Sequence, residues 1–130
     1  MRLEILNSHY SLRAKAIFAV VRLVSRRPLP DAARLGFYRP DFYGRLSNEL
    51  AHETMRGPSA WSVGDRELMA AVVSQANHSA FCVGAHTATA SGAYRDPAKV
   101  TAVLTDLETA PIEEPLRATL RLLRRLTQEG

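Results

Sequence analysis

The chain has 130 residues, 46% hydrophobic and 23% charged, a balance typical of one ordinary globular domain. We therefore predict a single domain over residues 1–130, in which residues 1–10 could form an N-terminal tail. No apolar run approaches the ~18 residues of a membrane-spanning helix, and Arg22 interrupts the apolar segment 14–24, which argues against a secretory signal. The single cysteine excludes an intrachain disulfide and favours a reducing, cytoplasmic location.

The net charge of +4 is unevenly distributed along the chain. Residues 1–60 carry ten Arg or Lys against five Asp or Glu, whereas residues 61–130 carry seven against eight. A basic half raises the question of a nucleic-acid partner. The basic residues are spaced through amphipathic segments rather than gathered in a run, so a solvated, salt-bridged face is the preferred interpretation, and we expect no nucleic-acid partner.

The first half of the chain shows the spacing of amphipathic helices. Apolar residues three and four apart predict a helix over 11–26 with Ser11 as its N-cap. A short helical turn follows over 31–37, and a third helix starts at residue 40 or 41 and ends near Met55. We expect this third helix to bury some of its apolar side chains, which are Phe42, Leu46 and Leu50.

The second half predicts four more helical segments. Ser62 with Asp65 three residues later resembles a capping box, which starts a helix that ends near Ala76. The remaining helices are predicted over about 79–93, from 96 to about 109–111, and over 112–128. No stretch alternates apolar and polar residues as a strand would. The predicted fold is therefore all-α, with six or seven helices.

Groups that can do chemistry are concentrated in residues 65–90. Ser79, Cys82 and His86 are three and four residues apart and would share one helix face. If Ser79 is the N-cap, Cys82 is the third helical residue, where unpaired N–H groups and the helix dipole favour a thiolate. His86 could take the thiol proton. Glu67 could orient His86 or accept its proton through a water, provided that the two helices pack antiparallel.

Each of these residues also has a structural interpretation. A lone cysteine is commonly a small buried hydrophobe, His86 could hydrogen-bond within the core, and Glu67 could be a solvated acid in the first turn of its helix. A metal site is not expected, because His78 precedes the cap and no fourth ligand accompanies it with Cys82 and His86. There is also no glycine-rich phosphate loop and no G-x-S-x-G motif, so we expect no cofactor.

The stretch ELMAAVVSQANHSAFCVGAH, residues 67–86, resembles the alkylhydroperoxidase D (AhpD) / carboxymuconolactone decarboxylase superfamily. Redox members carry a glutamate, then twelve residues on the first cysteine of a C-x-x-C, then a histidine four residues after the second cysteine. Glu67, Ser79, Cys82 and His86 occupy those positions. The resemblance covers about residues 30–128 and includes Tyr-Arg-Pro-Asp at 38–41, Gly-Pro-Ser at 57–59, Trp-Ser at 61–62 and Leu-Leu-Arg-Arg-Leu-Thr at 122–127.

The resemblance implies an AhpD-like helical domain, built on an antiparallel helix pair, that assembles as a dimer, trimer or hexamer. Redox members of the superfamily reduce hydroperoxides or pass electrons to a peroxiredoxin. In them the second cysteine, matched by Cys82, is activated through the histidine and the glutamate, and the first cysteine forms a disulfide with it. Here Ser79 replaces that first cysteine, and Phe81 stands where relatives often have His or Tyr.

Because of Ser79 the dithiol cycle cannot run within this chain, and three functions remain. The first is an antioxidant activity in which Cys82 reduces a small hydroperoxide through a sulfenic acid that an external thiol reduces. The second is acid–base chemistry with His86 and Glu67, as in the decarboxylase branch that lacks cysteines. The third is a degenerate site in a binding or assembly protein. We predict the first, with Cys82, His86, Glu67 and Ser79 as site residues.

Overall fold

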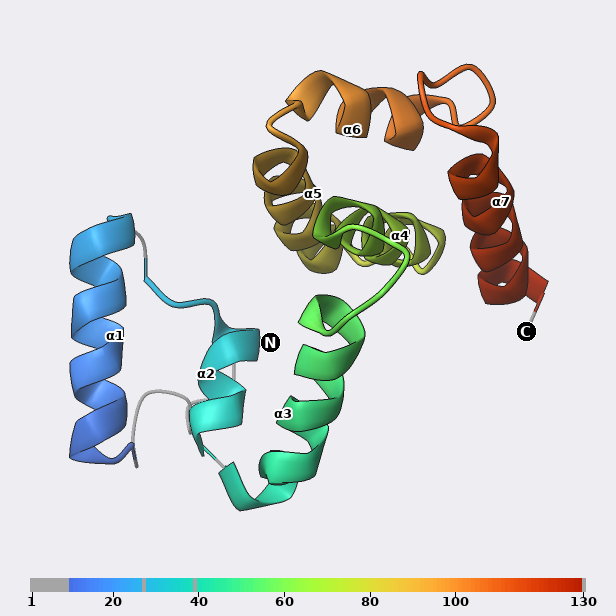
Figure 1. Cartoon of the computed structure of the whole chain (residues 1–130). Helices are drawn as coiled ribbons and strands as arrows, with labels where there is room; N and C mark the ends of the chain where they lie inside the picture. Colours follow the sequence, from blue (N-terminus) through green and yellow to red (C-terminus); the bar gives the residue numbers. More distant parts are fainter. Residues whose placement is uncertain (1–9, 27, 39, 130) are drawn as a thin grey trace. The chain divides into compact units, whose positions relative to one another are not determined.

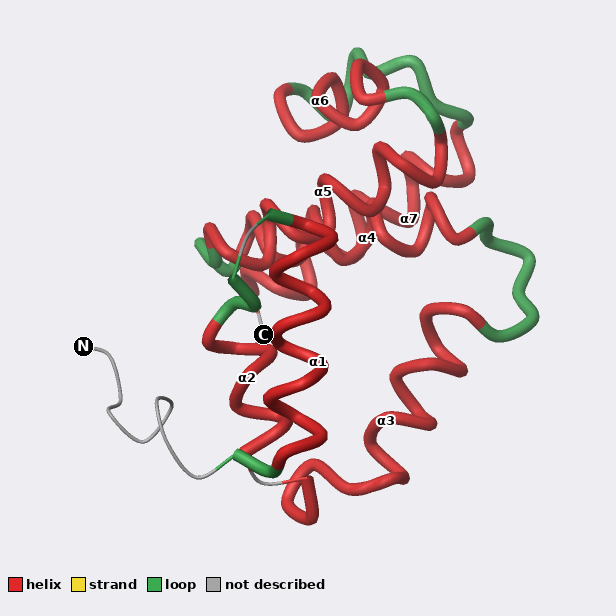
Figure 2. Tube along the Cα trace, turned by 90° about the vertical axis from the view of Figure 1, so that its left-hand side faces the viewer, coloured by secondary structure: helices red, strands yellow, loops and turns green. Residues whose placement is uncertain are grey.

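The computed structural model describes residues 10–26, 28–38 and 40–129, and every regular element in these ranges is a helix (Figure 1). Figure 2 shows the helices joined by loops, with no strand in the described residues. The predicted all-α fold is confirmed. The helices are α1 (Leu12–Ser25), α2 (Asp31–Tyr38), α3 (Pro40–Arg56), α4 (Val63–Ala76), α5 (Ala80–Tyr94), α6 (Pro97–Thr105) and α7 (Glu114–Glu129).

The chain divides into two compact units, residues 1–52 and residues 53–130, and α3 runs through the division. The single domain over 1–130 stays a prediction. The predicted tail falls almost wholly on residues 1–9, which lie outside the described residues; its last residue, Tyr10, is buried. None of the helices in the described ranges combines the length and apolar character needed to cross a lipid bilayer.

In the first unit, α1 begins where its sequence predicts. The backbone N–H of Ala14 donates to Ser11 Oγ at 3.2 Å, which confirms Ser11 as the N-cap. Tyr10 and Ala14 are buried, but much of the remaining apolar surface of α1 is exposed. On α3, Leu46 and Leu50 are 77% and 70% exposed, so neither is among the side chains that this helix buries. The side chain of Phe42 lies outside those described, so its burial stays a prediction.

In the second unit, α4 starts with the predicted capping box. Ser62 Oγ accepts from the Asp65 N–H at 3.1 Å, and Asp65 Oδ2 accepts from the Ser62 N–H at 2.9 Å. The other oxygen of Asp65 accepts from the Tyr94 hydroxyl at 2.5 Å. Since Tyr94 ends α5 and Asp65 starts α4, this bond joins opposite ends of the two helices. They therefore pack antiparallel, as the resemblance implies.

A three-residue turn joins α4 to α5. The N–H of His78 donates to Gln75 O at 3.0 Å, and the N–H of Ser79 donates to Ser74 O at 2.9 Å. These are the two bonds of a Schellman motif, whose left-handed position is taken by His78 with φ 56°. The turn places Ser79 directly before α5, so Cys82 is the third residue of that helix, as predicted.

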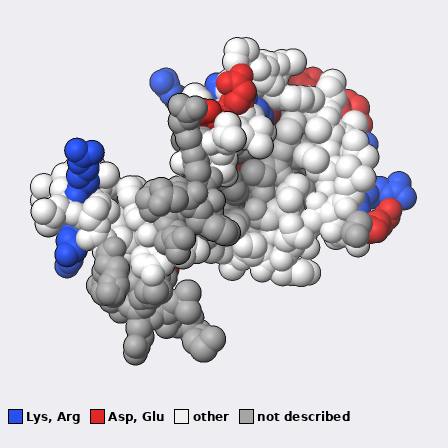
Figure 3. Space-filling view, turned by 90° about the horizontal axis from the view of Figure 1, so that it is seen from below, with Lys and Arg blue, Asp and Glu red and all other residues white. Residues whose placement is uncertain are grey.

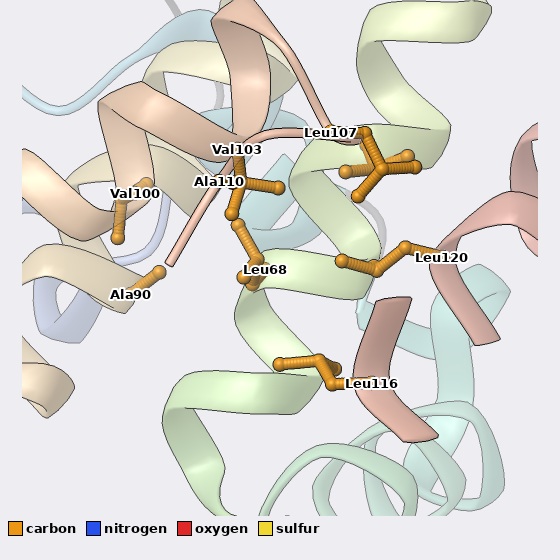
Figure 4. Close-up of a cluster of buried hydrophobic side chains, with 9 residues drawn as sticks. Leu68, Ala90, Val100, Val103, Leu107, Ala110, Leu116 and Leu120 are labelled. Carbon is orange, nitrogen blue, oxygen red and sulfur yellow. The ribbon is translucent and has the colours of Figure 1, made fainter. Parts of the chain in front are cut away.

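The core of the second unit lies between α4 and the later helices (Figure 4). α4 contacts α5, α6 and α7, and α6 also contacts α5. Leu68, Val100 and Leu120 are fully buried, and each such side chain stabilises the fold by about 1.5–3 kcal/mol. The other members of the buried cluster are Val72, Ala90, Val103, Leu107, Ala110 and Leu116. This core fixes α4 and α5 side by side and so positions the residues of the candidate site.

The boundaries of the last two helices differ from the prediction. α6 ends at Thr105 rather than near 109–111, because Asp106 side-chain oxygens accept from the Glu108 N–H and the Thr109 hydroxyl and so stabilise a turn. α7 begins at Glu114 rather than at 112. Between them, the Arg117 guanidinium donates to the carbonyl oxygens of Leu107, Glu108, Ala110 and Ile112, which satisfies the backbone of the loop.

The arginines of α7 lie beside acidic side chains. Arg121 forms ion pairs with Glu108 and Glu114, and Arg117 also pairs with Glu114. Figure 3 shows acidic and basic side chains next to one another at more than one place on the face that it presents. Among the described residues visible on that face, the basic side chains do not form a continuous patch.

Candidate functional site

The carboxylate of Glu67 is the centre of the candidate site. Glu67 lies on α4, and its side chain is only 4% exposed. Its Oε2 lies 2.7 Å from His86 Nδ1 on α5, and its Oε1 accepts from Arg56 Nη2 at 2.5 Å. Each oxygen therefore has a donor of its own, which is what a buried carboxylate requires.

The contact between Glu67 and His86 is direct. The antiparallel packing brings together two residues that are nineteen positions apart in the chain, and no bridging water is needed at 2.7 Å. An ionised carboxylate only accepts hydrogen bonds, so His86 must carry a proton on Nδ1. In a neutral imidazole with that proton, Nε2 has a free lone pair and can act as a base.

Cys82 lies one helical turn before His86 on α5. Side chains four residues apart on a helix share one face, with Cβ atoms about 5–6 Å apart. Cys82 is half-buried and His86 is 33% exposed, so both are accessible to a small molecule. Among the described residues, no hydrogen bond joins the Cys82 thiol to His86 in this structure.

Ser79 is the N-cap residue of α5, but its side chain accepts no capping hydrogen bond. It lies three residues before Cys82, which is the spacing of a C-x-x-C pair. Cys82 is within the first turn of α5, where backbone N–H groups have no partner inside the helix and the dipole favours an anion. The structure thus brings Glu67 and His86 into contact, and it places Cys82 one turn before His86 and Ser79 at the N-cap of the same helix.

Competing effects act on the pKa of Glu67. Burial would raise this pKa, but the hydrogen bonds from His86 and Arg56 and the guanidinium charge outweigh burial and hold it below its ordinary value. Glu67 is therefore ionised over the whole neutral range. The carboxyl of Asp65 behaves alike: burial opposes ionisation, but the bonds from Tyr94 and Ser62 lower its pKa.

Sequence reasoning missed Arg56 as part of the site. Arg56 is the last residue of α3, and its Nη1 also donates to Met55 O at 2.8 Å. It lies eleven residues before Glu67, and the contact depends on the path of the irregular segment 57–62. An arginine before Gly57-Pro58 is a weak signal, because nothing in the spacing shows which way its side chain turns.

The residues of this site do not form a metal centre. In the part of the chain that the structure describes, no three His, Cys, Asp or Glu side chains lie together in a way that could hold a metal ion. What the site offers is a carboxylate, an imidazole and a thiol on two antiparallel helices. That arrangement is suited to proton transfer and to nucleophilic chemistry at sulfur.

Comparison with known proteins places this helical arrangement in a family. The sequence model described as "Carboxymuconolactone decarboxylase family" matches residues 40–125, and the chain belongs to that family. The match is somewhat narrower than the predicted 30–128 and leaves out α1 and α2. A search of curated proteins and a search of solved structures each found no match.

Proposed function

We propose that this protein is a thiol-dependent, hydroperoxide-reducing antioxidant that works with one cysteine. The observation that carries the proposal is the bond of 2.7 Å between Glu67 and His86, one helical turn from the only cysteine in the chain. Cys82 is the nucleophile, His86 the base, and Glu67 the group that orients His86. Ser79 can donate a hydrogen bond to the thiolate but cannot form a disulfide.

The reaction balances in two stages. His86 Nε2 takes the proton of the Cys82 thiol, and the thiolate attacks the terminal oxygen of a hydroperoxide ROOH. An S–O bond forms as the O–O bond breaks, and the imidazolium returns the proton to the leaving alkoxide. The sulfur is oxidised by two electrons to a sulfenic acid, and the peroxide is reduced to the alcohol ROH.

An external thiol R′SH completes the cycle, because Ser79 supplies no second sulfur. It condenses with the sulfenic acid to give a mixed disulfide and water. A second R′SH then releases the Cys82 thiol and R′SSR′ by thiol–disulfide exchange. A reducing compartment such as the cytoplasm would supply that thiol, and this is the location that we propose.

The test is hydroperoxide consumption with dithiothreitol as the external thiol. We expect turnover by the wild-type protein, none by Cys82→Ser, and strongly reduced turnover by His86→Ala. Ser79→Cys provides a matched gain-of-function control, since it restores C-x-x-C and should yield an intrachain disulfide after oxidation. Equal rates for wild type and Cys82→Ser would disprove the proposal.

A second candidate is acid–base chemistry without sulfur. It is favoured by one observation: the Glu67–His86 pair is fully formed, whereas no hydrogen bond joins it to Cys82 among the described side chains. His86 would then remove or deliver a proton on a small acidic substrate. This candidate predicts an activity that Cys82→Ser retains and that His86→Ala loses. If the wild-type protein shows neither activity, a binding or assembly protein remains as the third alternative.

We also propose that the protein is a homo-oligomer, either a dimer, a trimer or a hexamer. The support is apolar surface that one chain leaves exposed. Monomeric proteins seldom expose large apolar patches. Light scattering should give a multiple of 14.4 kDa, and a mass of 14.4 kDa would contradict the proposal. The exposed side chains that support it are Leu12, Val20, Leu23 and Val24 on α1 and Leu46 and Leu50 on α3.

A further inference from the structure

Arg56 has the geometry of a residue that controls Glu67. Its Nη2 lies 2.5 Å from Glu67 Oε1, while its Nη1 is held at 2.8 Å by Met55 O at the end of α3. Its side chain is 38% exposed, so its charge is partly solvated, whereas the Glu67 side chain is 4% exposed. The buried member of this ion pair is therefore the carboxylate, and the guanidinium is what compensates its charge.

The chemistry of the two groups sets the direction of proton movement. A guanidinium does not lose its proton in proteins, so it stabilises only the ionised form of Glu67. The groups that favour this ionised form are Arg56 from α3 and His86 from α5, and together they outweigh the effect of burial on the pKa of Glu67. A carboxylate held in this way is a strong hydrogen-bond acceptor and a weak proton acceptor.

We infer that Arg56 is a positioning residue that keeps Glu67 a permanent anion, so that the thiol proton stops at His86 and does not move on to Glu67. The inference rests on the proposed function for the role of His86, but not for the state of Glu67. It differs from the predicted relay, in which Glu67 accepts a proton through a water. Glu67 instead stays ionised and accepts the hydrogen bond from His86 Nδ1–H, so that Nε2 is the nitrogen that takes the thiol proton.

Arg66 provides a matched control from the same region. Its Nη1 donates to Thr54 O at 3.0 Å and to Gly57 O at 2.9 Å, so it ties the α3–α4 junction together. Arg66→Gln therefore removes one arginine from this junction without removing the partner of Glu67. Arg56→Lys is the conservative variant, because it keeps the positive charge near Glu67 but loses the planar fork.

The experiment is ¹³C NMR of the glutamate side-chain carboxyl groups as a function of pH. The Glu67 signal is assigned by its absence in Glu67→Gln. In the wild type it should titrate below the ordinary glutamate value of about 4.3. In Arg56→Gln its midpoint should rise by about one pH unit or more, since a cation at this distance lowers a carboxyl pKa by about 1–3 units. Arg56→Lys should restore most of the shift, and Arg66→Gln should leave it unchanged.

Several results would overturn the inference. A wild-type Glu67 midpoint at or above about 4.3 would do so without any variant, even if Arg56→Gln failed to fold. An unchanged Glu67 midpoint in Arg56→Gln would also overturn it. An equal rise of the midpoint in Arg66→Gln would do the same, since it would mean that the midpoint depends on the intact α3–α4 junction and not on the Arg56 charge. The proposed function can fail separately: if wild-type Cys82 does not react with peroxide while the Glu67 midpoint moves as expected, the inference about Arg56 stands alone.

Discussion

Replacing Glu67 by glutamine should reverse the tautomer of His86. Arg56 can only donate, so the amide oxygen of Gln would face its Nη2, now 2.5 Å from Glu67 Oε1. The amide NH₂ would then face His86 Nδ1, now 2.7 Å from Glu67 Oε2. Nδ1 would have to accept, and the ring proton would move to Nε2. His86 would lose the lone pair that it needs to take a proton from Cys82.

The size of the effect follows from thiol chemistry. An unassisted thiol with a pKa of ~8.5 is only ~3% thiolate at pH 7, so complete ionisation can raise its rate by at most ~30-fold. The lower intrinsic nucleophilicity of a more acidic thiol cancels part of that gain, since the Brønsted slope is ~0.4–0.5. We therefore expect Glu67→Gln to slow alkylation of Cys82 by about three- to tenfold at pH 6–7, with no difference above pH ~9.

The assay is the pH profile of Cys82 alkylation by iodoacetamide, measured by mass spectrometry. Glu108→Gln is a matched control, because Glu108 is also paired with an arginine, Arg121, but is exposed and, among the described residues, forms no hydrogen bond with His86. This control should reproduce the wild-type profile. Unchanged alkylation in Glu67→Gln at pH 6–7 would refute the tautomer argument. An equal loss at every pH would also refute it, since that would indicate altered access to the thiol.

Three further predictions concern stability. Because the pKa of Glu67 is lowered in the folded protein, its ionised carboxylate adds to the free energy of unfolding. This contribution is fully present above the unfolded-state pKa of about 4.3 and is lost as pH falls through the folded-state pKa. The difference in unfolding free energy between wild type and Glu67→Gln should therefore shrink in acid. Leu120→Ala removes a side chain that is 0% exposed and should cost about 2–5 kcal/mol in urea unfolding, whereas the exposed Leu122→Ala should cost much less. Gly64→Ala would place a Cβ 2.8 Å from the ring of Tyr94 and should lower stability by about 1–3 kcal/mol, which thermal unfolding would show.

Local signals explain how much of the fold the sequence predicts. Ser11 and the Ser62–Asp65 pair predict helix N-termini through hydrogen bonds that span only three residues. The structure contains both sets of capping bonds. The predicted end of α6 lies too late in the chain, because the Asp106 side chain competes with the helix for hydrogen-bond donors. The spacing of apolar residues does not reveal this competition. His78 was not expected at a left-handed position, which usually belongs to Gly or Asn.

The candidate site divides in the same way. Cys82 and His86 belong to one helix that Ser79 precedes as N-cap, so the common face of Cys82 and His86 follows from their spacing alone. The contact of Glu67 with His86 requires the antiparallel packing, which the resemblance supplied. The contact of Arg56 with Glu67 depends on an irregular turn and on a long, flexible side chain, and no periodicity encodes either. Sequence patterns thus predict what one helix determines, and miss what a loop determines.

Trapping of a sulfenic acid at Cys82 tests the central claim most directly. The protein would be treated with one equivalent of hydrogen peroxide in the presence of dimedone, and the adduct located by peptide mass spectrometry. We predict a dimedone adduct on Cys82 in the wild type and a strongly reduced yield in His86→Ala at neutral pH. An absent adduct in the wild type, or an equal yield in the two proteins, would contradict activation of Cys82 by His86.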